Sequence, residues 1–187
     1  KTFLLLFAAL FLGTASVRVS GVEIGEPAPD FILPALANVT ARFDQVNDKT
    51  GSAYPLLRLK EYRGSFLYLD FWASYCVPCR ESFPLLDRLR NQFDRSDFEV
   101  ISVSNDLNPK DALRFIEDFP ISFPVLSDPT GRLAQLYGVE VLPKGFLIDA
   151  TGVVRLVHEG FQTGDIRDIL APVLEQYSRR DIVEQKK

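Results

Sequence analysis

The chain has two cysteines, Cys76 and Cys79, separated only by Val77 and Pro78. Two cysteines placed at random in this chain would fall three apart only about 1% of the time, so the spacing indicates a joint function. Such a pair can cycle between dithiol and disulfide: one thiolate attacks a partner disulfide, and the other thiol resolves the mixed disulfide. The same atoms serve both directions of electron flow, so the pattern leaves the direction open.

Other uses of the pair fit the sequence less well. A closed zinc site needs four ligands, whereas the chain offers two cysteines and one histidine, His158, which we interpret as structural. A purely structural disulfide would close a very short loop, where the entropic gain is smallest. A peroxide-reducing cysteine is a further alternative, but no threonine is placed ahead of Cys76 to activate a peroxide. We therefore expect a redox-active pair, with an inert disulfide as the alternative, and no metal.

The segments around the pair predict a strand that leads into a helix. Residues 66–72 form an aromatic and aliphatic run of buried-strand length, and residues 80–93 place apolar side chains at steps of three or four. A helix start offers unpaired N–H groups and the positive end of the dipole, which favour a thiolate. Cys76 is thus expected to be the exposed, acidic nucleophile, and Cys79 the more buried resolving thiol.

The remaining elements alternate between strand and helix, which predicts an α/β sheet with helices on both faces. Asn108 and Pro109 have the residue types of a helix cap and a first helical position. Thr163 or Asp165 is expected to cap the last helix, and Pro172 to kink or end it. The expected strands are 31–33, 56–59, 98–104, 123–127, 145–149 and 153–158, and the expected later helices are 109–119, 132–137 and one ending near 177.

Several motifs resemble one family. Residues 70–79, DFWASYCVPC, resemble the active-site stretch of the thioredoxin superfamily, and Pro84 matches its helix-kinking proline. Residues 137–143, YGVEVLP, resemble the segment that leads to its cis-proline, and residues 25–31, GEPAPDF, resemble the entry of the TlpA/ResA-like branch. The resemblance covers about residues 22–177. It implies a thioredoxin-like α/β fold: a central mixed β-sheet flanked by helices, with a βα insert and an N-terminal extension.

Asp70 lies in the middle of an apolar strand, where a carboxylate is costly to bury. The resemblance implies an acid beneath Cys79 that helps to deprotonate it, and burial would raise the pKa of Asp70 toward that of a useful base. An edge position open to solvent is the alternative. The TlpA/ResA-like branch often has a neutral residue here and carries its acid in the insert. Asp106 is the nearest candidate for that second acid, although a solvated turn is the simpler interpretation of this residue.

The resemblance also implies a surface that binds partner proteins. Pro143 is expected to be cis and to face the cysteines, leaving the backbone of Leu142 free to pair with a bound peptide; a trans proline is the alternative. Lys144 departs from the family pattern and is expected either to add positive potential near Cys76 or to point into water. The other expected partner contacts, with core packing as the alternative for the two aromatic residues, are Trp72, Tyr75 and Pro78.

The ends of the chain differ in composition from its middle. Residues 1–21 combine Lys1, an apolar run over residues 3–12 and a small-residue patch, which predicts a signal peptide or N-terminal anchor. Residues 22–177 fit one domain, and residues 178–187 form a charged tail. Removing residues 1–21 changes 21 basic and 25 acidic residues to 19 and 25, so the net charge of about −6 gives no support for nucleic-acid binding.

These observations predict an exported thiol–disulfide oxidoreductase, located in the periplasm or on the outer side of the membrane. The resemblance implies a reductant of partner-protein disulfides of the cytochrome c maturation type, without a cofactor, monomeric, and re-reduced by a membrane electron donor. Two alternatives remain open: a redox-silent binding module with a static disulfide, and an oxidase that forms disulfides. The reduction potential of the pair would separate all three.

Overall fold

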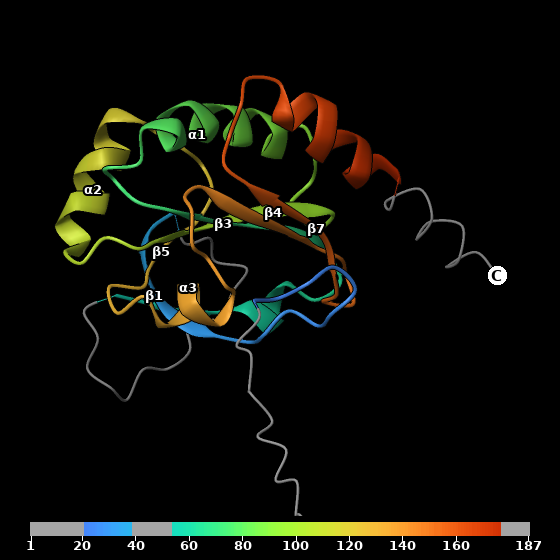
Figure 1. The fold of residues 1–187 in the computed structure, drawn as a ribbon, viewed down its shortest axis with the longest axis horizontal. Helices are drawn as coiled ribbons and strands as arrows, with labels where there is room; N and C mark the ends of the chain where they lie inside the picture. Colours follow the sequence, from blue (N-terminus) through green and yellow to red (C-terminus); the bar gives the residue numbers. More distant parts are fainter. Residues whose placement is uncertain (1–20, 39–53, 177–187) are drawn as a thin grey trace, which may run out of the picture.

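The computed structural model describes residues 21–38 and 54–176 (Figure 1). The expected signal peptide or anchor and the charged tail lie outside the described residues. So does the segment from Asp44 to Gly51, whose polar composition predicts a loop. Within those residues, none of the helices has the length and hydropathy of a membrane span.

The described residues form one mixed sheet of seven strands in the order β2-β1-β5-β4-β3-β6-β7. The three central strands β3, β4 and β5 are parallel to one another, and the outer strands add antiparallel pairs on both sides. Every residue of β3 and β4 is buried, as is typical of strands covered on both faces. The strands are β1 (Ile32–Ala37), β2 (Leu56–Arg58), β3 (Phe66–Trp72), β4 (Phe98–Ser104), β5 (Val125–Ser127), β6 (Lys144–Ile148) and β7 (Val154–Glu159).

Helices cover both faces of this sheet (Figure 1). α1 (Val77–Arg90), α2 (Pro109–Asp118) and the C-terminal helix lie on one side, and α3 (Arg132–Leu136) and the 3₁₀ turn η1 (Leu59–Tyr62) lie on the other. The sequence signals at the start of α2 are confirmed: Asn108 Oδ1 accepts a hydrogen bond from Lys110 N at 3.2 Å, and Pro109 is the first helical residue.

Two apolar clusters fill the space between the layers. On the α3 side, Phe71 packs 5.4 Å from Tyr137 between ring centroids, and on the α1 side, Trp72 packs 4.6 Å from Phe83 and from Phe115. Each fully buried side chain of this size contributes on the order of 2 kcal/mol to stability. Successive residues of β3 contribute to the two clusters in turn, so the residues in phase with Trp72 face α1.

A buried ion pair fastens the end of α1 to β4. Arg90 Nε lies 2.8 Å from Glu99 Oε1, and Arg95 Nη1 lies 2.9 Å from Glu99 Oε2. Glu99 is fully buried and Arg90 nearly so. Because both charges have lost their water, neither partner can be removed without leaving the other unpaired.

The C-terminal helix reaches residue 176, in agreement with the expected end near 177, but its first part was not predicted. Its first part is the wide π-turn η2 (Ile166–Leu170), and the helix then continues to residue 176 through Pro172. Pro172 has no N–H to donate to the carbonyl four residues earlier, so the turn before it loses a regular hydrogen bond without ending the helix. Asp165 begins the helix, but its side chain does not cap it.

Candidate active site

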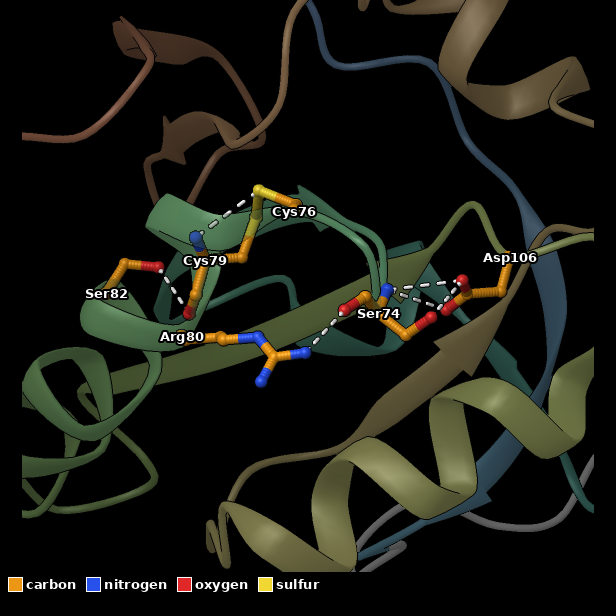
Figure 2. The surroundings of a disulfide bond; sticks show 6 residues. All are labelled: Ser74, Cys76, Cys79, Arg80, Ser82 and Asp106. Carbon is orange, nitrogen blue, oxygen red and sulfur yellow. Dashed lines mark hydrogen bonds between the residues drawn. A yellow bond between two sulfur atoms is a disulfide. The ribbon is translucent and has the colours of Figure 1, made fainter.

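The dithiol lies where β3 gives way to α1. Cys76 is the N-cap residue of α1, and its Sγ accepts a hydrogen bond from Cys79 N at 3.3 Å (Figure 2). The two sulfurs are joined in a disulfide, with a Cα–Cα distance of 5.3 Å. Cys76 is 6% exposed and Cys79 0%. The predicted order of burial is confirmed, but the prediction that Cys76 is exposed is wrong, because its sulfur folds back over the start of the helix.

The electrostatic setting of Cys76 favours a thiolate. No acidic residue lies in the first turn of α1, so the positive end of the helix dipole is not offset there. Arg80 lies in the same turn, and its Nη2 donates a hydrogen bond to the Ser74 carbonyl at 3.4 Å (Figure 2). A negative charge that develops on the Cys76 sulfur is therefore met by the backbone N–H groups and the dipole of the helix start, while the Arg80 guanidinium lies over the Phe115 and Phe119 rings.

Asp70 is 2% exposed and lies on the face of β3 that turns toward α1, in phase with Tyr68 and Trp72. The edge position open to solvent is therefore wrong, since β4 and β6 pair with β3 on either side. Asp70 and Ser82 line one cavity, and Ser82 Oγ donates to the Cys79 carbonyl at 3.2 Å. The carboxyl thus lies beneath the part of α1 that carries Ser82 and Leu86.

The chemical state of Asp70 follows from its surroundings. Burial raises the pKa of this carboxyl well above its ordinary value, because the charged form has lost its water. Its Oδ2 has no hydrogen-bond partner in the structure. A buried acid without a compensating cation holds its proton more tightly than a solvated one, and this is the property required of a base that works near neutral pH.

Asp106 holds the loop that carries the dithiol. Its carboxylate accepts hydrogen bonds from Ser74 N at 3.0 and 3.1 Å, from Ser74 Oγ at 2.7 Å and from Ser104 Oγ at 2.8 Å (Figure 2 shows the Ser74 contacts). It is buried. The interpretation of Asp106 as a solvated turn residue is therefore wrong, because four donor contacts replace the water it loses.

Sequence reasoning missed the two serines that bind Asp106. Ser104 is the last residue of β4 and lies beside Trp72, the last residue of the parallel strand β3. Ser74 comes two residues after Trp72. Since the carboxyl ends of adjacent parallel strands meet at one edge of a sheet, the polar residues after 72 and at 104–106 could have been placed together from sequence. That signal identifies the anchor of the loop.

Of the residues expected to contact a partner protein, some are at the surface and others are buried. The Leu142–Pro143 peptide bond is cis, and Pro143 lines the same cavity as Asp70. Tyr75 is 71% exposed, and Pro78, three residues later, is half-buried. Trp72 is fully buried, so its expected place on the dithiol surface is wrong; it packs between rings of the core instead.

Two further residues lie where sequence reasoning did not put them. Lys144 is buried, and its Nζ donates to the Gly138 carbonyl and pairs with Glu159, so it does not point into water. His158 is half-buried on β7, and it lines the cavity that Asp70 also lines. The interpretation of His158 as structural rests on the lack of metal-ligand partners for it in the chain, and that interpretation gives it no place; two antiparallel pairings bring it to the same face of the sheet as Asp70.

Comparison with known proteins identifies the family. A family model described as the AhpC/TSA family matches residues 24–157. The chain belongs to the AhpC/TSA family. Within it, the chain is 30% identical to the thiol-disulfide oxidoreductase ResA of Geobacillus thermodenitrificans over 163 residues, which cover 86% of this chain and 84% of that protein. It is 28% identical to the thioredoxin-like protein YneN of Bacillus subtilis, over 80% of this chain and 79% of YneN.

Solved structures agree with this assignment. A protein described as thiol:disulfide interchange protein DsbE, from Chlorobium tepidum, superposes with a TM-score of 0.69 at 36% identity, covering 82% of this chain and 99% of that one. The exposed lipoprotein thioredoxin of Streptococcus pneumoniae superposes with a TM-score of 0.60 at 28% identity, covering 79% and 99%. This AhpC/TSA-family protein therefore has the predicted thioredoxin-like fold and is a thiol–disulfide oxidoreductase.

Proposed function

We propose that this protein is an exported reductant of disulfides in partner proteins, in which Cys76 attacks, Cys79 resolves and Asp70 accepts the proton of Cys79. The observation that carries the proposal is the position of the disulfide: it begins α1, and the same helix, through Ser82, covers a buried carboxyl that has no partner at Oδ2. The same arrangement would serve an oxidase, and the resemblance of the sequence motifs to the TlpA/ResA-like branch favours the reducing direction.

In the first step, the Cys76 thiolate of the reduced protein attacks one sulfur of the partner disulfide. A mixed disulfide forms, and the other partner sulfur leaves as a thiolate. The start of α1 stabilises the attacking thiolate through its free N–H groups and dipole.

In the second step, the proton of the Cys79 thiol passes to the Asp70 carboxylate, and the Cys79 sulfur attacks Cys76. The Cys76–Cys79 bond forms, the mixed disulfide breaks, and the partner is released as a thiolate. The cavity that Asp70 and Ser82 line has about 10 Å³ of room, close to what one water molecule needs. The wall of this cavity reaches Cys79 through Ser82, whose hydroxyl donates to the Cys79 carbonyl, and one water there is the proposed carrier of the proton from the thiol to the carboxylate.

Exposed apolar side chains surround the dithiol and supply a surface for a polypeptide. Tyr75 and Val77 flank Cys76 in the sequence and are both exposed. Leu107 follows Asp106, which is bound to the dithiol loop, and it is also exposed. Val141 is exposed two residues before Pro143. We expect an extended, apolar segment of the partner to lie across these residues, with its disulfide over Cys76.

The proposed location and partner class rest on the sequence and the relatives. Residues 1–21 have the pattern of a signal peptide or anchor. The streptococcal relative is described as an exposed lipoprotein, which supports a site outside the cytoplasm. The resemblance to the TlpA/ResA-like branch favours cytochrome c maturation as the setting, with re-reduction by a membrane electron donor.

The test is to trap the partner. Cys79→Ser removes the resolving thiol, so the variant, expressed with its leader in an exporting cell, should accumulate a disulfide-linked complex that reductant dissolves. Cys76→Ser is the matched control and should trap nothing. Trapping only by Cys76→Ser would reverse the roles of the two cysteines. A strongly oxidising reduction potential, or a disulfide that thiols do not reduce, would overturn the proposed reductant.

A further inference from the structure

A row of three residues crosses the sheet behind the dithiol. Asp70 of β3 lies opposite Gly145 of β6, and Gly145 lies opposite His158 of β7. Residues directly opposite in antiparallel pairs face the same side of a sheet, so Asp70 and His158 both face α1 and the C-terminal helix. The residue between them has no side chain, which leaves a gap in the row.

The hydroxyl of Tyr68 fills that gap. A Cβ atom built on Gly145 would collide with the Tyr68 Oη, so this oxygen lies over Gly145, between Asp70 and His158. Tyr68, Asp70 and His158 line the same small cavity, together with Asp165 at the start of the C-terminal helix. Burial and the charges of Asp70 and Asp165 raise the pKa of Tyr68, so the phenol keeps its proton and remains able both to donate and to accept.

His158 connects this cavity to the surface. Its Nε2 lies 3.2 Å from Asp165 Oδ2, and both side chains are 18% exposed, against 2% for Asp70. A carboxylate at Nε2 holds the proton of a neutral imidazole there and leaves Nδ1 as an acceptor. A proton arriving at Nδ1 can therefore leave from Nε2, which is the property of a relay.

The other residues around Asp70 are not suited to carry a proton from Asp70 to the surface. α1 presents Ser82, whose hydroxyl is engaged with Cys79, and the apolar Leu86, and the C-terminal helix presents Ile166 and Leu170 beside Asp165. Lys144, next to Gly145 on β6, belongs to the opposite face by strand alternation and is paired with Glu159. Among the described residues that line the cavity, the proton-carrying side chains that lead outward are Tyr68, His158 and Asp165.

We propose that Tyr68, His158 and Asp165 form the route by which Asp70 returns its proton to solvent. This rests on the proposed role of Asp70 as the acceptor of the Cys79 proton. The O–H bond of Asp70 breaks, the Tyr68 hydroxyl or the cavity water passes the proton on, and an N–H bond forms on His158. The proton on the other nitrogen passes to water, either directly or through Asp165, which then releases it. No electrons move; the imidazole is left with its proton on Nδ1 and regains the Nε2–H form by proton exchange with water before the next cycle.

The route is tested by following Asp70 itself. His158→Gln keeps an Nε2 that can donate to Asp165 but cannot relay a proton, and Tyr68→Phe keeps the ring and removes the hydroxyl. In an upward pH jump in weak buffer, the infrared carboxyl band of Asp70, assigned by its loss in Asp70→Asn, reports proton release. We expect release to be roughly tenfold slower in both variants, as for the loss of one positioned proton carrier. Phe161→Leu, which alters an apolar wall of the cavity, is the control and should release at the wild-type rate.

A second measurement separates a relay from a structural effect. His158→Gln should slow resolution of a mixed disulfide between Cys76 and a model peptide in weak buffer, and should add no further slowing in an Asp70→Asn background. Added imidazole should restore the rate. Wild-type release rates in both variants, or equal slowing with and without Asp70, would overturn the relay. Because the infrared experiment needs only the folded protein, a failure to trap a partner with Cys79→Ser would refute the proposed function while leaving this route intact.

Discussion

Replacing Asp70 with asparagine removes a buried, titrating carboxyl while keeping its shape, and the effect on stability can be worked out from the pKa. In the unfolded chain, Asp70 has an ordinary pKa of 3.8, and in the folded protein burial raises it. Between these two values, the folded protein holds a proton that the unfolded chain has released. Wild-type stability is therefore full below pH 3.8 and falls as the pH rises toward the folded pKa, by about 1.4 kcal/mol per pH unit.

Asp70→Asn has no such proton and should lack this slope. Its free energy of unfolding should match the wild type below pH 3.8, exceed it increasingly as the pH rises, and stay ahead by a constant amount above the folded pKa. The gain at pH 7 cannot exceed about 4 kcal/mol, which is one proton over the interval from 3.8. In a domain of this size, each kcal/mol shifts Tm by roughly 2–4 °C.

The assay combines urea unfolding of both proteins from pH 4 to pH 8 with stopped-flow kinetics on the Trp72 signal. The pH at which the stability difference levels off gives the folded pKa directly. In the kinetics, resolution by Cys79 should slow by about tenfold or more, the scale of a lost general base, while attack by Cys76 stays within about twofold. A stability difference that does not change with pH, together with equal resolution rates, would refute the reasoning, since Asp70 would then titrate alike in both states.

Three further predictions concern the surroundings of the dithiol. In the reduced protein, the pKa of Cys76 should fall to about 5–7.5, measured as the pH dependence of its alkylation; a value near that of a free thiol would contradict the helix-start argument. Asp106→Asn should weaken the hydrogen bonds to Ser74 and lower the free energy of unfolding, measured with a chemical denaturant, by about 1–3 kcal/mol; the alkylation of Cys76 should then no longer follow a single rate. Unchanged stability would show that the contact is dispensable. Glu99→Gln should cost about 3–5 kcal/mol by leaving Arg90 buried without its counter-charge, and a cost below 1 kcal/mol would show that the pair is solvated.

The central strands and the first two helices could be predicted from sequence because their signals are local. β4 (Phe98–Ser104) has the predicted bounds, and the start of α2 follows from its cap residues. α1 begins at Val77, three residues ahead of the period that indicated it, since Pro78 and Cys79 carry no apolar periodicity. The dithiol and its helix-start position were therefore available from the residues alone.

Contacts that cross several strands could not be obtained in this way. His158 approaches Asp70 only because two antiparallel pairings share Gly145, and a shift of one residue in either register would turn it to the opposite face. Whether Trp72 reaches the surface likewise depends on Phe115, which belongs to a different element. Asp106 is a turn residue by type, and its burial follows from where β3 and β4 end together.

The hydrogen bonds between Asp106 and Ser74 connect the segment after β4 to the loop that carries Cys76, although the two residues are 32 apart in the sequence. Among the described hydrogen bonds, the loop before α1 has no other long-range side-chain contact. The position of Cys76 relative to the sheet therefore depends on Asp106, which belongs to the insert. A partner that presses on Leu107 pushes on the residue next to this anchor. Binding of a partner at Leu107 would then affect the position, and hence the reactivity, of the Cys76 sulfur. Partners that contact only Tyr75 would react with a thiol whose position is less closely fixed.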